Sequence, residues 1–347
     1  TYPGLLPQWG EDGPADAAPG AAPAGGSAGD CAGGSAGDSA RRVHLVGHSL
    51  GGQTGRVLIQ LLAEGSAEER AATPADSLSP LFAGGKDWVA SLTTIATPHD
   101  GTTLVARYDL HGDFLKPLFA AWIALSATSS EVYYDFKLEQ WGLERRPGEE
   151  YRRYRDRVLS HEIWRHTTDT AYWDGSPEGA RELNRWVRAR PEVYYFSWST
   201  EATWRDPFDG KQVPELGMPA SMASLARFIG AYTREVGRAS GKETGGAGRA
   251  SDSPVPIDSS WWPNDGVVNT RSMAGPTLGA VDRIAAFNGT PLPGVWNHMG
   301  TLRSFDHLDV IGIPLPKTPR GYHSLVDWYV AHAHLLASLP ELRIQNP

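Results

Sequence analysis

The stretch RVHLVGHSLGGQT, residues 42–54, carries a short apolar run, the motif GHSLG at 47–51, and then the start of an expected helix. This order is typical of the strand–elbow–helix unit in which G-x-S-x-G forms a strained turn and presents a nucleophilic serine. The motif alone also occurs by chance in Gly-rich turns without chemistry. Here the strand before it and the helix after it are both visible, so we predict Ser49 as a nucleophile.

Length and composition exclude several classes of protein and of site. The 347 residues suffice for one large α/β domain or two small ones, and 40% apolar residues suit a globular core. A net charge of −8 without a long basic run argues against nucleic acid as a partner. The single Cys31 excludes an internal disulfide and a Cys-based zinc site. No run of about 18 apolar residues exists, so we expect no transmembrane segment.

The chain outside two low-complexity stretches alternates between strand and helix patterns. Residues 8–40 and 237–254 are rich in Gly, Ala, Ser and Asp, and we interpret them as loop insertions in one domain, 1–347. We expect strands at 43–47, 91–98, 192–200 and 294–302, and helices at 53–63 and 323–339. In the first helix, Val57, Leu58, Leu61 and Leu62 form the expected buried face, and Gly65 the stop. This alternation predicts an α/β fold with a mostly parallel sheet.

A serine nucleophile needs a base, and in this fold the triad order is Ser, then acid, then His. We expect the base in the loop between the last strand and the closing helix, where His307 lies. His298 falls inside the expected strand and is interpreted as packed. His161 and His166 are separated by about 140° on a helix, so they do not share a face as zinc ligands would.

Two aspartates compete for the role of the acid. Asp265 lies in the turn of NDGVVNT, ahead of a β-like run and between Ser49 and His307 in the sequence. Asp100 follows the second expected strand. Each also has a purely structural interpretation, Asp265 as a turn residue and Asp100 as a cap or hydrogen-bond anchor. The order of the triad favours Asp265 without excluding Asp100.

A series of blocks in order along the chain resembles the staphylococcal and thermoalkalophilic bacillus lipases. They include TYPGLLP at 1–7, GHSLGGQT at 47–54, TTIATPHDGTTLV at 93–105, NDGVVNT at 264–270 and DHLDVIG at 306–312. The resemblance implies an α/β-hydrolase fold, with helices on both faces of the sheet, and a secreted triacylglycerol lipase acting on lipid or ester at an oil–water interface. It makes Ser49 the nucleophile, Asp265 the acid and His307 the base.

The resemblance also implies two structural metals. Its calcium positions fall on the Gly217 carbonyl and on Asp309, where an aspartate replaces the family's glutamate. A further family carboxylate falls near Pro314, which has no side-chain oxygen to offer. Calcium prefers six or more oxygens, so we expect a weakened site. Of the zinc ligands only Asp169 matches; the others belong to a family segment that precedes TYPGLLP.

The sequence has no signal peptide or initiator Met, and we expect a chain shortened at its N-terminus. The family segment before TYPGLLP holds the first strands of the sheet and one oxyanion N–H, so we expect both to be missing here. The remaining oxyanion donor is the backbone N–H of Leu50.

Residues 108–128 resemble the family's lid, although an apolar helix of this kind is also typical of a core. Three alternatives to lipase activity stay open. They are a short-chain carboxylesterase or acyltransferase, a catalytically silent lipid-surface binder, and an incomplete gene product without an independent fold.

Overall fold

The computed structural model describes residues 42–105, 138–161, 168–235, 253–313 and 316–342. The insertion at 8–40, the lid region at 108–128 and nearly all of 237–254 lie outside these residues, so the predictions made for them stay predictions. No helix in the described ranges is both long and apolar enough to span a membrane.

The centre of the fold is a five-stranded sheet in which every pair of neighbours is parallel. Its order is β1 (Val43–His48), β2 (Val89–Ile95), β3 (Tyr194–Glu201), β7 (Trp296–Arg303) and β6 (Ile284–Ala286). A two-stranded antiparallel ribbon follows β3 and consists of β4 (Thr203–Arg205) and β5 (Gln212–Pro214). All four predicted strands are confirmed, with ends that differ by no more than three residues.

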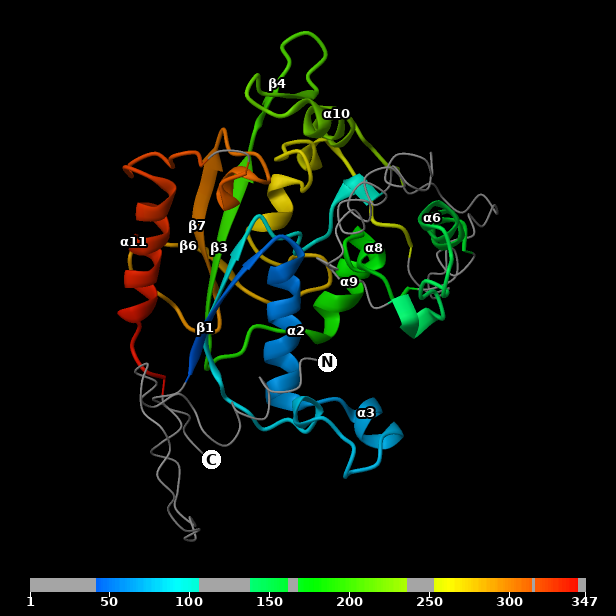
Figure 1. Ribbon diagram of the computed structural model, residues 1–347. Helices are drawn as coiled ribbons and strands as arrows, with labels where there is room; N and C mark the ends of the chain where they lie inside the picture. The colour runs from blue at the N-terminus through cyan, green and yellow to red at the C-terminus, as the bar shows by residue number, and fades with distance from the viewer. Residues whose placement is uncertain (1–41, 106–137, 162–167, 236–252, 314–315, 343–347) are drawn as a thin grey trace, which may run out of the picture.

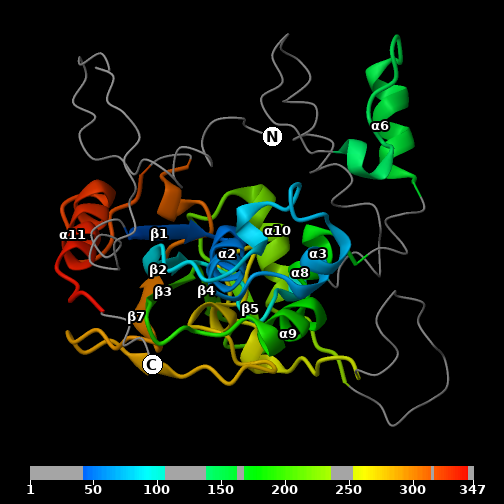
Figure 2. The same cartoon turned by 90° about the horizontal axis from the view of Figure 1, so that it is seen from below.

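Helices cover both faces of the sheet. In Figures 1 and 2, α11 lies on one side, and α2, α8 and α9 lie on the other. The α-helices are α2 (Leu50–Glu64), α3 (Ala67–Ala72), α6 (Tyr151–Leu159), α8 (Ala171–Asp174), α9 (Pro177–Trp186), α10 (Ala220–Ile229) and α11 (Leu325–Ala337). The short 3-10 helices are η2 (Pro80–Phe82), η3 (Thr103–Val105), η4 (Leu138–Trp141), η5 (Ser259–Trp261), η6 (Thr270–Met273) and η7 (Asp309–Ile311).

The central strand β3 is buried on both faces because its side chains alternate between the two helical layers. Tyr195 packs with Ile59 and Leu62 of α2. Its neighbours Tyr194 and Phe196 pack with Leu336 of α11. The run of aromatic residues at the start of β3 therefore reflects a strand covered by helices on either side.

The buried face predicted for α2 is confirmed at Leu62, which is 6% exposed, and differs elsewhere. Val57, Leu58 and Leu61 are only partly buried, whereas the polar Gln53 and Arg56 are buried with Ile59. Polar groups can occupy a core when hydrogen bonds replace their contacts with water. The Arg56 guanidinium donates to Asn184 Oδ1 at 2.8 Å, and Gln53 Nε2 donates to the Pro98 carbonyl at 2.8 Å. An apolar pattern could not show these partners, which come from distant segments.

The C-terminal helix α11 closes the second layer. Trp328 is 1% exposed and packs in a cluster with Ile95 of β2 and Leu302 of β7. Its ring meets that of Trp198 on β3 at a centroid distance of 5.1 Å, in an edge-to-face arrangement. This residue therefore ties α11 to the three central strands.

We predict that Trp328→Ala lowers the free energy of unfolding by about 3–5 kcal/mol, because it leaves a large cavity beneath α11. Val326→Ala on the same helix is the matched control, since Val326 is 68% exposed and its truncation should change stability by less than about 0.5 kcal/mol. Urea unfolding followed by circular dichroism measures both. Equal losses in the two variants would contradict the packing described here.

Candidate active site

Ser49 lies between the end of β1 and the start of α2 in a strained backbone conformation. Its φ of 56° and ψ of −134° are rare for a residue with a side chain. Two hydrogen bonds hold this conformation: the Ser49 N–H donates to the Ile95 carbonyl at 2.9 Å, and the Thr97 hydroxyl donates to the Ser49 carbonyl at 2.8 Å. The end of β2 and the loop after it thus fix the elbow that the GHSLG motif predicts.

Two glycines allow the helix to start so close to the sheet. A Cβ at Gly47 would lie 2.6 Å from backbone atoms of Gly51 and Gly52, and a Cβ at Gly52 would lie 2.1 Å from the Thr97 hydroxyl oxygen. At Gly51, the last glycine of the motif, a Cβ would meet nothing within 4 Å. The steric demand therefore falls on Gly47 and Gly52.

The structure brings together the three residues predicted as a triad. Ser49 Oγ lies 2.9 Å from His307 Nε2, and His307 Nδ1 lies 2.8 Å from Asp265 Oδ2. An ionised carboxylate can only accept, so Nδ1 carries the proton and leaves Nε2 to accept the Ser49 hydroxyl. This is the tautomer that a general base at Ser49 requires.

Asp265 is completely buried, yet it is placed to stay ionised. Its Oδ1 accepts from the backbone N–H groups of Val267 and Val268 at 3.0 and 2.8 Å, and its Oδ2 accepts from the Thr200 hydroxyl at 2.7 Å. Burial alone would raise its pKa, but His307 and these donors outweigh burial and hold the pKa of Asp265 below its usual value. The predicted β-like run after Asp265 is instead an irregular loop that supplies two of the donors.

The backbone around His307 is held from two directions. Its N–H donates to the Asp265 carbonyl at 3.0 Å, and its own carbonyl accepts from His48 Nε2 at 2.9 Å. Burial and the nearby His307 lower the pKa of His48 to about 4, so His48 is neutral near pH 7. The elbow residue before the nucleophile thus also positions the base.

Sequence reasoning did not identify His48, Thr97 or Thr200 as part of this site. His48 stands inside the quoted motif, but G-x-S-x-G leaves its position unspecified. The two threonines are spread along the chain, and only the fold brings them to the elbow and to Asp265. A sequence pattern offered no signal for either.

Leu50 is the first residue of α2, and its N–H belongs to the first turn of the helix. The N–H groups of a first turn have no partner inside the helix and point toward the site that the N-terminus faces. The role of Leu50 as an oxyanion donor stays a prediction.

Asp100, the rival candidate for the acid, anchors a loop. Its Oδ1 accepts from the N–H groups of Thr277 and Leu278 at 2.7 and 2.8 Å, and its Oδ2 accepts from the Thr277 hydroxyl. Asn184 also donates to Oδ1, at 3.2 Å. These bonds hold Asp100 against residues 277–278. Of the two candidates for the acid, Asp265 is the one that contacts His307.

The described residues contain no cluster of side chains for the predicted metals. Among the described residues, no group of three or more His, Cys, Asp or Glu side chains could hold an ion. Asp169 and Gly217 are both exposed, and Pro314 lies outside the described residues. The Asp309 Oδ2 accepts from the Lys317 ammonium at 3.1 Å, an arrangement that does not fit a divalent cation on the same oxygen. Calcium and zinc stay predictions.

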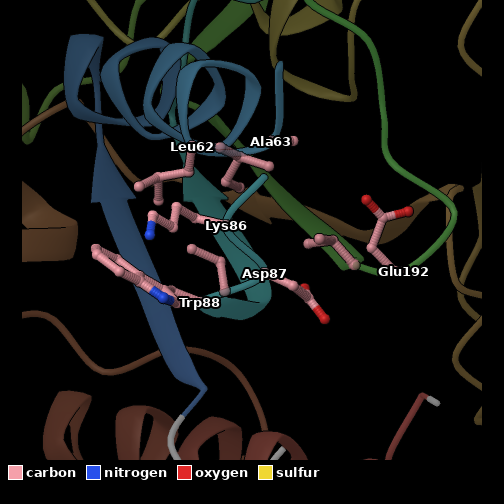
Figure 3. A pocket seen from close by; sticks show the side chains of 9 residues that line it. Leu62, Ala63, Lys86, Asp87, Trp88 and Glu192 are labelled. Atoms are coloured by element: carbon pink, nitrogen blue, oxygen red, sulfur yellow. The ribbon is translucent and has the colours of Figure 1, made fainter. Parts of the chain in front are cut away.

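A shallow surface hollow lies at the edge of the sheet opposite to Ser49. It is lined by the end of α2 and the residues that lead into β2 and β3, including Val89 and Val193. Figure 3 shows Leu62, Lys86 and Trp88 around it. Parallel strands all begin at this edge, whereas Ser49 follows the end of β1, so the hollow is separate from the triad.

Comparisons with known proteins identify the family of this chain. The family model described as "Lipase-like, C-terminal domain" matches residues 35–244. The chain belongs to this lipase-like family. Lipase 1 from Pelosinus fermentans has a solved structure that is 46% identical, with a TM-score of 0.68, covering 86% of this chain and 72% of that one. EstA from Clostridium botulinum is 39% identical with a TM-score of 0.74, covering 88% and 66%.

The curated relatives are longer proteins. Lipase 2 of Staphylococcus aureus is 30% identical over 292 residues, which cover 83% of this chain but 38% of that protein. The predicted family and the α/β-hydrolase fold are thereby confirmed.

We predict that Gly52→Ala lowers the rate of ester hydrolysis about 10- to 100-fold, because the new Cβ displaces Thr97 and with it the bond to the Ser49 carbonyl. Gly51→Ala is the matched control and should leave the rate near that of the unchanged protein. Steady-state kinetics on a soluble ester measure both. A larger loss in Gly51→Ala than in Gly52→Ala would contradict this account of the elbow.

Proposed function

We propose that this protein hydrolyses carboxylic esters through an acyl intermediate on Ser49, with triacylglycerols as its substrate class. The observation that supports this best is the continuous hydrogen-bonded line from Ser49 through His307 to Asp265. Such a line is what converts a weakly nucleophilic hydroxyl into a reactive one.

In the first half of the reaction, His307 Nε2 takes the hydroxyl proton while Ser49 Oγ bonds to the ester carbonyl carbon. The buried Asp265 carboxylate stabilises the imidazolium that forms, because it accepts the Nδ1–H and keeps its charge. The Leu50 N–H donates to the oxyanion. His307 then gives its proton to the alcohol oxygen as the ester bond breaks.

In the second half, His307 takes a proton from water, and the water oxygen attacks the acyl carbon on Ser49. The proton returns to Ser49 Oγ as the fatty acid leaves. A neutral His48 suits both halves, because a second positive charge beside His307 would disfavour the imidazolium. No redox cofactor is needed at any step.

The preference for long acyl chains and an extracellular location rest on the resemblance to lipases and on relatives that are named lipases. A short-chain esterase or an acyltransferase would use the same three residues. A silent lipid-surface binder would keep the fold without turnover. The length of the acyl chain is therefore the variable that separates these proposals.

We predict that p-nitrophenyl esters are hydrolysed with kcat/KM that rises from acetate to long acyl chains, and that Ser49→Ala loses at least about 10³-fold. Asp265→Asn should lose a similar amount because the amide no longer holds the right tautomer of His307. Asp100→Asn is the matched control, because it also removes a buried carboxylate charge. Thermal unfolding of every variant shows whether a loss of activity reflects a loss of stability.

Three outcomes bear on this proposal differently. Rates highest on acetate would favour the short-chain esterase. A protein that melts cooperatively but hydrolyses no ester would favour the silent binder. Asp100→Asn losing more activity than Asp265→Asn, at equal stability, would contradict the assignment of the acid.

A further inference from the structure

The loop between β7 and η7, residues 304–308, carries His307 and is built around two carboxylates. Asp306 Oδ1 accepts from the N–H groups of Leu308 and Asp309 at 2.9 and 3.1 Å. Asp309 Oδ2 accepts from the N–H of Asp306 at 2.7 Å. The two side chains thus bind each other's backbone across the turn that holds the base.

This arrangement places the carboxylates of Asp306 and Asp309 in one turn, where both are buried from solvent. Asp306 is 3% exposed and Asp309 is 8% exposed. Their N–H donors are dipoles and supply no net positive charge. The Asp309 charge acts against the ionised form of Asp306, so a cation beside the turn would stabilise it.

Lys317 supplies that cation from eight residues further along the chain. Its ammonium donates to Asp309 Oδ2 at 3.1 Å and to the Ser304 carbonyl, and it interacts electrostatically with Asp306. It also lies over the Phe305 ring, 5.4 Å from the centroid. The ammonium therefore touches the loop at its start and near its end, with His307 between the contacts.

Ser304, at the start of the loop, has a strained backbone conformation. Its φ of 61° is a left-handed conformation that a residue with a side chain rarely adopts. The carbonyl of this residue accepts from the Lys317 ammonium. A strained residue persists when its surroundings hold it in place, and Lys317 is one of the groups that do so.

We propose that the Lys317 ammonium is a built-in cation that positions His307, in the place where the resemblance to lipases implies a calcium ion at Asp309. Lys317 touches neither substrate nor the reacting atoms, so it is a positioning residue. The proposal rests on the proposed function for its kinetic consequences, but not for its structural ones.

The test compares Lys317→Met, which keeps the length of the side chain and removes its charge, with Lys317→Arg, which keeps the charge. We expect Lys317→Met to lower kcat about 10- to 100-fold with little change in KM, since the loop orients the base and does not hold the acyl chain. Lys317→Arg should retain most of the activity. Arg320→Met removes an exposed positive charge three residues away and is the matched control.

Amide hydrogen exchange at residues 304–309 gives a readout that is independent of catalysis. Exchange should become faster in Lys317→Met and stay slow in Lys317→Arg and Arg320→Met. Unchanged exchange and unchanged kcat in Lys317→Met would overturn the proposal. If the unchanged protein hydrolyses no ester and exchange is still faster in Lys317→Met, the role of Lys317 is supported and the proposed function is rejected.

Calcium provides the second arm of the test. The unchanged protein should keep its activity and its exchange pattern in excess EGTA, because its cation is covalently attached. Added calcium should slow the exchange of 304–309 in Lys317→Ala, because the shortened side chain leaves room for the ion beside Asp309. A loss of activity in EGTA that calcium restores in the unchanged protein would show that calcium, rather than Lys317, is the cation of this loop.

Discussion

The structure depends on how closely α2 approaches the sheet at the end of β1. The chain must turn from strand to helix within one residue, and Ser49 takes the strain of that turn. The turn is possible because Gly47 and Gly52 leave no side chain in the gap, and it is stable because Thr97 and Ile95 of the neighbouring strand region bind the Ser49 backbone. The Ser49 side chain is thereby placed at the edge of the sheet where the parallel strands end.

The rest of the site follows from the same edge. Asp265 and His307 come from segments more than 200 residues beyond Ser49, and they meet it because the connections of a parallel sheet emerge together at the ends of its strands. His48, Thr200 and Lys317 hold these loops in register through hydrogen bonds and charge. The site thus combines a rigid elbow with two loops that are fastened to it.

Much of this arrangement could be predicted from the sequence, because the strands are apolar runs and the elbow has a spaced motif. The triad order identified His307 and favoured Asp265. Leu62 of α2 was predicted on the buried face, but the burial of Gln53 and Arg56 could not be predicted, since they enter the core through partners on distant segments. The supporting threonines and Lys317 were missed for the same reason: each acts through a contact that no local pattern encodes. The metal sites and the lid stay predictions.

The central claim is that His307 and Asp265 activate Ser49 as a nucleophile. Reaction of the folded protein with a fluorophosphonate, followed by peptide mapping in a mass spectrometer, tests it most directly. The account predicts one adduct, on the peptide that carries Ser49, formed much more slowly when His307 is replaced by Ala. No adduct on a protein that unfolds cooperatively, or an adduct on a different serine, would contradict it.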